Sequence, residues 1–314
     1  MGAPVLLCDL SLAPAVALAV TRNGGRPEHV RRYDCATRGA FDDAIKTYID
    51  EIGEGTPGAV AMAGRGWQDR ERLHLQGVGF ELSRDDLRTL AGVQRVNFLN
   101  NFVARALAVP RLSRQDRYAI VAGQSNDDSV IAVLGPHYGL GLAALVSDGV
   151  GGWTALHGEG GHSDLPVKTE HEWRLVEAMR ARTGYVSRET GISVNGLVDI
   201  WTALHVLAGE TAQATTAAEI IAAARSGQPR AVEAIDTMTA WLGAMASDIV
   251  LIMGANAVYL TGALLDMIGD LFNAEIFRTR YLDKGPRTAY VTAVPVFRTR
   301  ATDMELAGLA TLFE

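Results

Sequence analysis

The chain has 314 residues, of which 48% are hydrophobic and 21% charged, as in ordinary globular proteins. Its net charge is -7, its pI is near 5.5, and its basic residues are scattered, with the densest stretch at Arg111–Arg117. Nucleic-acid binding needs clustered cations, so we expect no nucleic-acid partner and interpret this stretch as a solvated face. The length favours two domains.

The chain's two cysteines, Cys8 and Cys35, stand in no paired motif, which fits a reducing cytoplasm and gives no metal signature. The apolar segment Pro4–Val20 resembles an exported leader, but no basic residue precedes it and Asp9 interrupts it. No later apolar run approaches the roughly 20 residues needed to span a bilayer. The sequence therefore predicts a cytoplasmic protein without a membrane partner.

The first third of the chain alternates apolar runs typical of strands with segments of helical spacing. Asn23–Gly25 predicts a tight turn, and apolar spacing in Phe41–Ile52 predicts a helix that ends at Gly53. Ser83 and the acids after it predict a capped helix start, and Phe102–Val109 a further helix. The expected strands are Val5–Asp9, Val16–Thr21, Arg31–Cys35, Ala59–Ala63 and Val93–Leu99.

The same alternation continues after Pro110, which marks the expected boundary between two lobes. The expected strands are Ser129–Leu134, Leu142–Ser147, Asn256–Thr261 and Thr288–Phe297. The expected helices are Glu170–Ala181, Ala203–Ala224, Arg230–Gly254, Leu264–Phe272 and Asp303–Phe313. This order predicts an α/β fold, with a small lobe over 1–110 and about 298–314, and a larger lobe with a helical insertion over 111–297.

Several short strings are spread along nearly the whole chain. The most specific is Gly158-Glu-Gly-Gly-His162, followed by Val-Ser-x-Glu within Tyr185–Glu189. The others are Leu99–Phe102, Gly139–Leu142, Gly196–Val198, Asp283–Gly285 and Val294–Phe297. Together they resemble the bacterial glucokinase family. The resemblance implies two actin-like (ribonuclease H-like) lobes flanking a central cleft, a hexose bound in that cleft, Mg-ATP as cofactor, a role in glycolysis and a homodimer.

The resemblance implies that the hexose contacts Asn100, Asn101, Glu159, His162 and Glu189. Carboxylates and amides suit adjacent hydroxyl groups because each offers two polar atoms in one plane. The glycines around Glu159 and His162 let the backbone turn tightly enough to aim both side chains at one point. A histidine among glycines is by itself usually an ordinary loop residue, and a zinc site would lack a third ligand. The shared context favours the sugar site.

Asn101 stands where the family has an aspartate that acts as general base on the sugar's 6-hydroxyl. An amide cannot accept a proton near neutral pH, and loss of a general base typically costs about 10²–10⁴ in rate. Asn101 therefore suits hexose binding and impairs catalysis. A structural alternative is that Asn101 caps the helix Phe102–Val109, and both roles can hold together.

The family binds ATP phosphates with two glycine-rich turns, the first of which normally reads Gly-Gly-Thr. Asp9 remains at the position of the metal-linked acid, and it would hold Mg²⁺ only if Mg-ATP binds. The following turn, Leu10–Pro14, contains no glycine, and its proline lacks a donor N–H. We expect this turn not to cradle phosphate, which would leave Asp9 as a polar strand end.

The second turn keeps three glycines of the family's phosphate motif, Gly135, Gly139 and Gly141. Tyr138 replaces a small threonine there, so a phosphate contact near Gly139 and a plain turn between strands are equal alternatives. The adenosine segment Asn256–Ala263 keeps Gly262 but not the neighbouring glycine. Both halves of the phosphoryl-transfer reaction are therefore altered.

Three functions are compatible with these residues. The first is a glucokinase-like protein that binds glucose or a related hexose, with impaired or absent 6-phosphorylation. The second is an active glucokinase (a phosphotransferase with an alcohol acceptor) of low or altered activity, since phosphoryl transfer depends mainly on positioning and electrostatics. The third is a non-catalytic interaction protein of the same fold. Retention of Glu159, His162 and Glu189 argues against the third, and the Leu10–Pro14 turn against the second.

Overall fold

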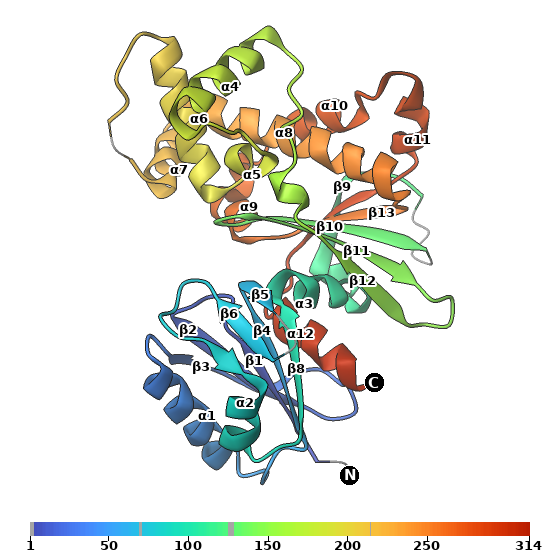
Figure 1. Cartoon of the computed structure of the whole chain (residues 1–314). Helices are drawn as coiled ribbons and strands as arrows, with labels where there is room; N and C mark the ends of the chain where they lie inside the picture. The colour runs from blue at the N-terminus through green and yellow to red at the C-terminus, as the bar shows by residue number, and fades with distance from the viewer. Residues whose placement is uncertain (1–2, 69–70, 125–128, 214) are drawn as a thin grey trace. The chain divides into compact units, whose positions relative to one another are not determined.

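The computed structural model describes residues 3–68, 71–124, 129–213 and 215–314. The chain divides into two compact units, both of mixed α/β structure (Figure 1). Unit 1 is Met1–Leu112 with Ala301–Glu314, and unit 2 is Ser113–Arg300.

Unit 1 contains the strands and helices of the first third of the chain together with the last helix. Its elements are β1 (Val5–Asp9), β2 (Ala15–Thr21), β3 (Glu28–Asp34), α1 (Arg38–Ile52), β4 (Ala59–Gly64), β5 (Gly66–Gln68), β6 (Arg72–Leu75), β7 (Leu82–Ser83), α2 (Arg84–Ala91), β8 (Arg95–Asn100), α3 (Asn101–Leu107) and α12 (Met304–Ala310). Short 3₁₀-helices follow α3 at Val109–Arg111 and α12 at Thr311–Phe313.

The centre of unit 1 is a five-stranded sheet in the order β3-β2-β1-β4-β8, with β1, β4 and β8 parallel. Side chains alternate between the two faces of a strand. Leu6 and Cys8 therefore pack with α1 and α2 on one face, while Val5 and Leu7 pack with α3 and α12 on the other (Figure 1). Asp9 continues the second set, so it belongs to the face that α3 and α12 cover.

Helices α3 and α12 approach each other closely at a glycine. A Cβ atom at Gly308 would lie 1.6 Å from the carbonyl oxygen of Ala104, so only a residue without a side chain permits this contact. The contact fixes α12, although it is distant in sequence, beside α3 and on the sheet. Residues at the start of α12 thereby become neighbours of residues in α3.

Unit 2 contains the remaining elements. They are β9 (Arg117–Val121), β10 (Val130–Pro136), β11 (Leu140–Ser147), β12 (Trp153–His157), α4 (Glu170–Thr183), α5 (Arg188–Gly191), α6 (Val194–Leu207), α7 (Ala217–Arg225), α8 (Pro229–Met253), β13 (Ala257–Leu260), α9 (Ala263–Ile268), α10 (Ala274–Leu282), α11 (Thr288–Thr292) and β14 (Val296–Thr299). Short 3₁₀-helices lie at Arg114–Asp116, Gly160–His162, Gly269–Leu271 and Gly285–Arg287.

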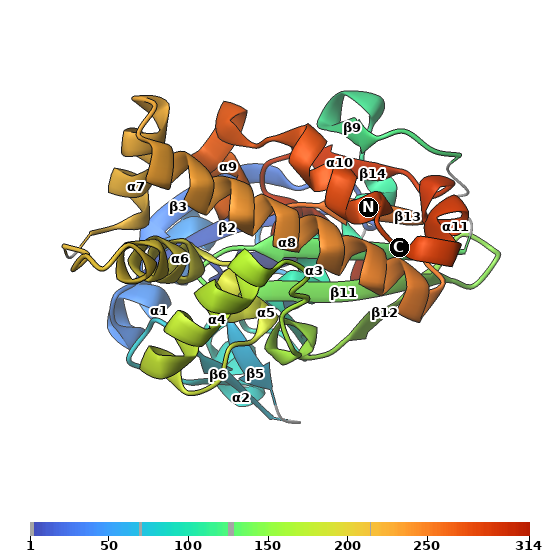
Figure 2. The same cartoon turned by 90° about the horizontal axis from the view of Figure 1, so that it is seen from above.

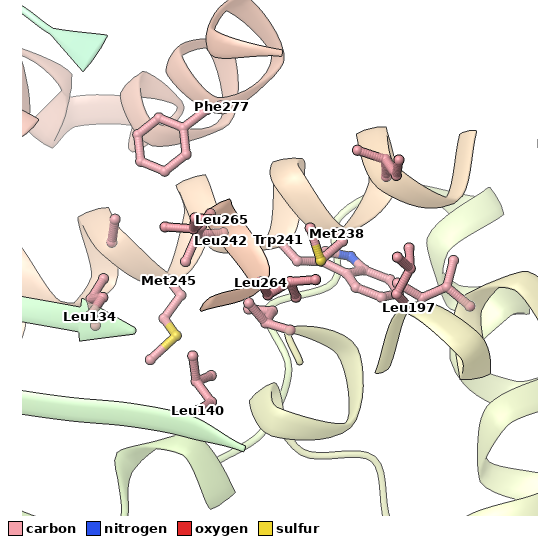
Figure 3. Close-up of a cluster of buried hydrophobic side chains, with 14 of the residues drawn as sticks. Leu134, Leu140, Leu197, Met238, Trp241, Leu242, Met245, Leu264, Leu265 and Phe277 are labelled. Carbon is pink, nitrogen blue, oxygen red and sulfur yellow. The ribbon is translucent and has the colours of Figure 1, made fainter. Parts of the chain in front are cut away.

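The strands of unit 2 form a six-stranded sheet in the order β12-β11-β10-β13-β14-β9, and α8 runs across it (Figure 2). The core lies between this helix and the sheet. Trp241 and Met245 of α8 belong to this core with Leu134 of β10 and Leu140 of β11, and Phe277 of α10 belongs to the same buried cluster (Figure 3). Burial of such large apolar side chains is the main favourable contribution to folding.

Among the described residues, α8 is the one helix long and apolar enough to cross a membrane by length and composition. The expectation that no run approaches that length is therefore wrong. However, 67% of the helix's most apolar window is buried inside the protein. That burial is ordinary for a core helix.

The strand expected over Thr288–Phe297 is wrong in its first half. Thr288–Thr292 forms helix α11, of which only Val291 is buried, and the strand begins at Val296. The Thr288 hydroxyl donates to the carbonyl of Leu282 at 2.9 Å, which ties the start of α11 to the end of α10. Pro295 immediately precedes the strand and has no N–H to donate to a ladder.

Candidate functional site

Strand β8 leads directly into α3, and Asn100 and Asn101 stand at this junction. Asn100 is the N-cap: its Oδ1 accepts from the N–H of Phe102 at 2.8 Å and of Val103 at 3.4 Å. Its Nδ2 donates to the carbonyl of Gly66 at 3.2 Å. The interpretation of Asn101 as the cap is therefore wrong. Asn101 is the first helical residue, and its side-chain amide has no hydrogen-bond partner among the described residues.

Replacing the cap should therefore affect stability more than replacing its neighbour. We expect Asn100→Ala to lower the free energy of unfolding by about 1 kcal/mol, since an N-cap oxygen is lost. Asn101→Ala, the matched control, should change it by less than about 0.5 kcal/mol. Urea denaturation of both variants measures the difference. Equal losses would show that Asn100 does not act as the cap.

Asp9 at the end of β1 is only 6% exposed, and its Oδ1 accepts from the N–H of Ser11 at 2.8 Å. On the face that it shares with α3 and α12, Arg105 of α3 and Glu305 of α12 form an ion pair at 2.7 Å. Glu305 is itself buried. Burial and the nearby charge of Glu305 raise the pKa of Asp9 to about 7, against the opposing effect of Ser11 and Arg105.

A carboxyl group with this pKa is partly protonated at neutral pH. The described residues contain no cluster of three or more histidine, cysteine, aspartate or glutamate side chains that could hold a metal ion.

The turn between β1 and β2 uses its own backbone donors. Its N–H groups already bond within unit 1: Leu10 to the Ala63 carbonyl, Ser11 to the Asp9 carboxylate, Ala13 to the Leu10 carbonyl and Ala15 to the Leu12 carbonyl. Pro14 has no N–H. An anion-binding turn needs several N–H groups that converge on one point. Leu12 alone offers one, and its own side chain is half exposed beside it. The turn does not fit phosphate.

The second glycine-rich turn is a short hairpin loop. Gly135 and Gly141 lie opposite each other in the ladder of β10 and β11, so only Gly139 belongs to the loop itself. The N–H of Leu140 donates to Oε2 of Glu189 at 2.9 Å. A Cβ atom at Gly139 would lie 2.7 Å from the same oxygen. The glycine therefore leaves room for Glu189, one of the predicted sugar residues.

Gly262 also has a packing role. Its φ angle is +115°, and a Cβ atom there would lie 2.4 Å from the carbonyl oxygen of Pro136. The glycine lets the backbone after β13 pass the end of β10, which accounts for it without a nucleotide. The packing roles of Gly139 and Gly262 neither require nor exclude a bound nucleotide.

Unit 2 brings two of the predicted sugar segments together. Asp164 and Ser187 form an antiparallel bridge, and the N–H of Arg188 donates to the carbonyl of Ser163 at 2.8 Å. The hydroxyl of Tyr185 donates to the carbonyl of His162 at 2.9 Å. The segment that ends in His162 therefore runs beside the segment that leads into Glu189.

Gly160 and Gly161 allow this segment to pack closely against β11, because a side chain at either position would clash with the strand. A Cβ atom at Gly161 would lie 2.5 Å from the carbonyl oxygen of Leu140, the residue whose N–H bonds Glu189. Glu159 and His162 extend away from this contact, with side chains 90% and 59% exposed. Nε2 of His162 and Oε2 of Glu159 are 3.9 Å apart, too far for a hydrogen bond, so both side chains remain available to a ligand.

The sequence interpretation missed Glu305 and Arg105 as neighbours of Asp9. Glu305 is an acid within the mostly apolar segment Met304–Ala310, and a buried charge needs a partner. An acid in an apolar helix could therefore have been recognised in the sequence. Its partner Arg105 could not, because the contact between α3 and α12 joins distant segments.

Comparison with known proteins identifies the family. The family model described as Glucokinase matches residues 13–314. A glucokinase-like protein of Caulobacter vibrioides is 35% identical over 302 residues, covering 95% of this chain and 93% of the relative. A glucokinase of Aromatoleum aromaticum is 31% identical over 314 residues, covering 99% and 95%.

The solved structures agree with this assignment. The crystal structure of a glucokinase from an Antarctic psychrotroph matches with a TM-score of 0.89 and 26% identity, covering 100% of this chain and 99% of the other. A hexokinase from Thermus thermophilus shares the fold at 19% identity, with a TM-score of 0.69. The predicted actin-like sugar-kinase fold is confirmed, and the chain belongs to the glucokinase family.

Proposed function

We propose that the chain binds glucose or a related hexose and transfers phosphate from ATP to it poorly or not at all. In unit 2 the residues proposed to contact the sugar are Glu159, His162 and Glu189. Asn100 and Asn101 of unit 1 are the other residues that the family resemblance assigns to the sugar. The observation that carries the proposal is the assembly in unit 2. Two segments far apart in sequence lie side by side there, with the heads of Glu159 and His162 exposed.

The catalytic half of the site supports binding without turnover. The amide of Asn101 can donate to and accept from a hydroxyl group, but it cannot take the proton that a nucleophilic hydroxyl must lose. Asn100 has one N–H left for a ligand after capping α3 and bonding Gly66. The Leu10–Pro14 turn lacks converging N–H groups for phosphate, so we assign no phosphoryl-transfer step to this chain.

An active glucokinase of low or altered activity is the second candidate. Its support is the set of relatives named glucokinase that match nearly the whole chain. It would require ATP to bind without the first turn and transfer to proceed without a base, which positioning alone can in part allow. Under either function we propose a cytoplasmic homodimer, as the family resemblance implies.

Glucose binding can be tested at Glu159. We expect calorimetry to detect heat on titration of the wild type with millimolar glucose. Glu159→Gln should weaken the affinity roughly 10- to 100-fold, because a charge-assisted hydrogen bond becomes a neutral one. Glu177→Gln, an exposed change in the same unit, is the control and should bind as the wild type does. Absence of heat with the wild type would overturn the proposal.

A further inference from the structure

Arg188 precedes Glu189 and is almost fully buried, at 9% exposure. Its Nη2 lies 3.3 Å from Oδ2 of Asp248 in α8, and its Nε donates to the carbonyl of Asp164 at 3.2 Å. Arg188 therefore ties the start of α5 both to the core helix α8 and to the segment that follows His162.

Asp248 is bonded from a second direction by Lys284, whose side chain is 16% exposed. Lys284 belongs to the Asp283–Gly285 string, to which the proposed function gives no role. The side chain of Asp248 is itself 24% exposed, so it is partly buried, and two cations share its carboxylate. Pairing offsets the cost of removing such a carboxylate from water.

Helix α5 needs this support because it has only four residues, Arg188–Gly191. A helix this short gains little from its own hydrogen bonds, so its orientation depends on tertiary contacts. One of those contacts holds its functional side chain: Oε2 of Glu189 accepts from the N–H of Leu140 at 2.9 Å. A displaced α5 would misplace this carboxylate relative to the loop and to the neighbouring segment that carries His162.

We propose that Asp248 and Lys284, acting through Arg188, are positioning residues that hold Glu189 in the geometry needed for hexose binding. They do not touch the sugar. The inference rests on the proposed function, because it assigns these residues to the same site. It gives the Asp283–Gly285 string a role at a distance from the ligand.

A second buried ion pair in unit 2 offers a matched control. Glu172 of α4 pairs with Arg280 of α10, and their side chains are 9% and 12% exposed. This pair is at least as buried as the Arg188–Asp248 pair and joins elements other than α5. Changing either carboxylate to its amide removes one charge without opening a cavity. Asp248→Asn and Glu172→Gln should both lose stability, but only Asp248→Asn should lose affinity for the sugar.

The experiment is calorimetric titration with glucose of the wild type, Asp248→Asn and Glu172→Gln, with melting temperatures measured in parallel. We expect Asp248→Asn to weaken glucose affinity about tenfold, which corresponds to the loss of about one hydrogen bond. Glu172→Gln should bind as the wild type does. Equal affinity in Asp248→Asn and the wild type would overturn the inference alone. Absence of heat with the wild type would overturn the proposed function, and the inference with it.

A second pair of variants decides the case if Asp248→Asn does not fold. Arg188→Lys keeps the charge opposite Asp248, and Arg188→Met removes it. We expect Arg188→Met to weaken glucose affinity and Arg188→Lys to restore most of it. A merely structural role would change the melting temperature of Arg188→Met without changing its affinity, and that result would overturn the inference.

Discussion

The wild-type chain should phosphorylate glucose from ATP at least about 10²–10⁴ times more slowly than a variant that carries both a carboxylate at position 101 and a glycine-rich first turn. That variant combines Asn101→Asp with Ser11→Gly, Leu12→Gly and Ala13→Thr. There are two physical reasons. The amide of Asn101 cannot accept the proton of the sugar hydroxyl, and the N–H groups of the Leu10–Pro14 turn already donate to acceptors within the protein. A coupled assay of ADP formation measures both rates.

Asn101→Asp alone is expected to restore little of this rate, because the first turn is unchanged. Arg105 also stands one helical turn after position 101, where a cation favours the ionised carboxylate and so makes it a weaker base. Asn101→Ala is the control, and it should be as inactive as the wild type. Readily measured turnover by the wild type would show that the amide at position 101 does not impair transfer.

Asp9→Asn should stabilise the protein at pH 8, with a rise in melting temperature on the order of 5 °C, and should have little effect near pH 4. The pKa of Asp9 is about 7 in the folded chain, above the usual value of about 3.9 for an unfolded one. Between about pH 4 and about pH 7 the carboxyl group of Asp9 therefore keeps its proton in the folded chain and loses it in the unfolded chain. The contribution of Asp9 to the free energy of unfolding falls as the pH rises through this range, and it stays low above about pH 7.

The amide removes this penalty and keeps an oxygen to accept from the N–H of Ser11. Thermal unfolding followed by circular dichroism at pH 4.5 and pH 8 gives the difference between variant and wild type. Asp50→Asn, at an exposed position of α1, is the control and should show no such pH dependence. A lower melting temperature for Asp9→Asn than for the wild type at pH 8 would contradict the conclusion that burial raises the pKa of Asp9.

Local signals in the sequence were enough for much of unit 1. The strand Val5–Asp9 has the predicted limits, and α1 ends at Gly53, which adopts the left-handed φ of 65° that glycine tolerates best. The Ser83 cap pairs reciprocally with Asp86, as the spacing predicts. Each of these features depends on residues within one turn of one another, so no tertiary information was needed.

Several features that the sequence did not predict depend on contacts between distant segments or on one-residue shifts. Asn100 and Asn101 are both good caps, and only the geometry at the end of β8 decides that Asn100 takes the role. Nothing local to Asp9 indicates the buried charge of Glu305, which arrives on the last helix. The bond from Glu189 to Leu140 joins residues 49 apart. The sequence offers candidate residues for the site, but their mutual arrangement could not be predicted from it.

We propose that the sugar half of the site binds its ligand and that the nucleotide half does not. One calorimetric experiment tests it most directly: titration of the wild-type chain with glucose to saturation, followed by Mg²⁺ with a non-hydrolysable ATP analogue. The predicted result is binding heat in the first titration and none in the second at millimolar nucleotide. Saturable heat in the second titration, or none in the first, would contradict the account.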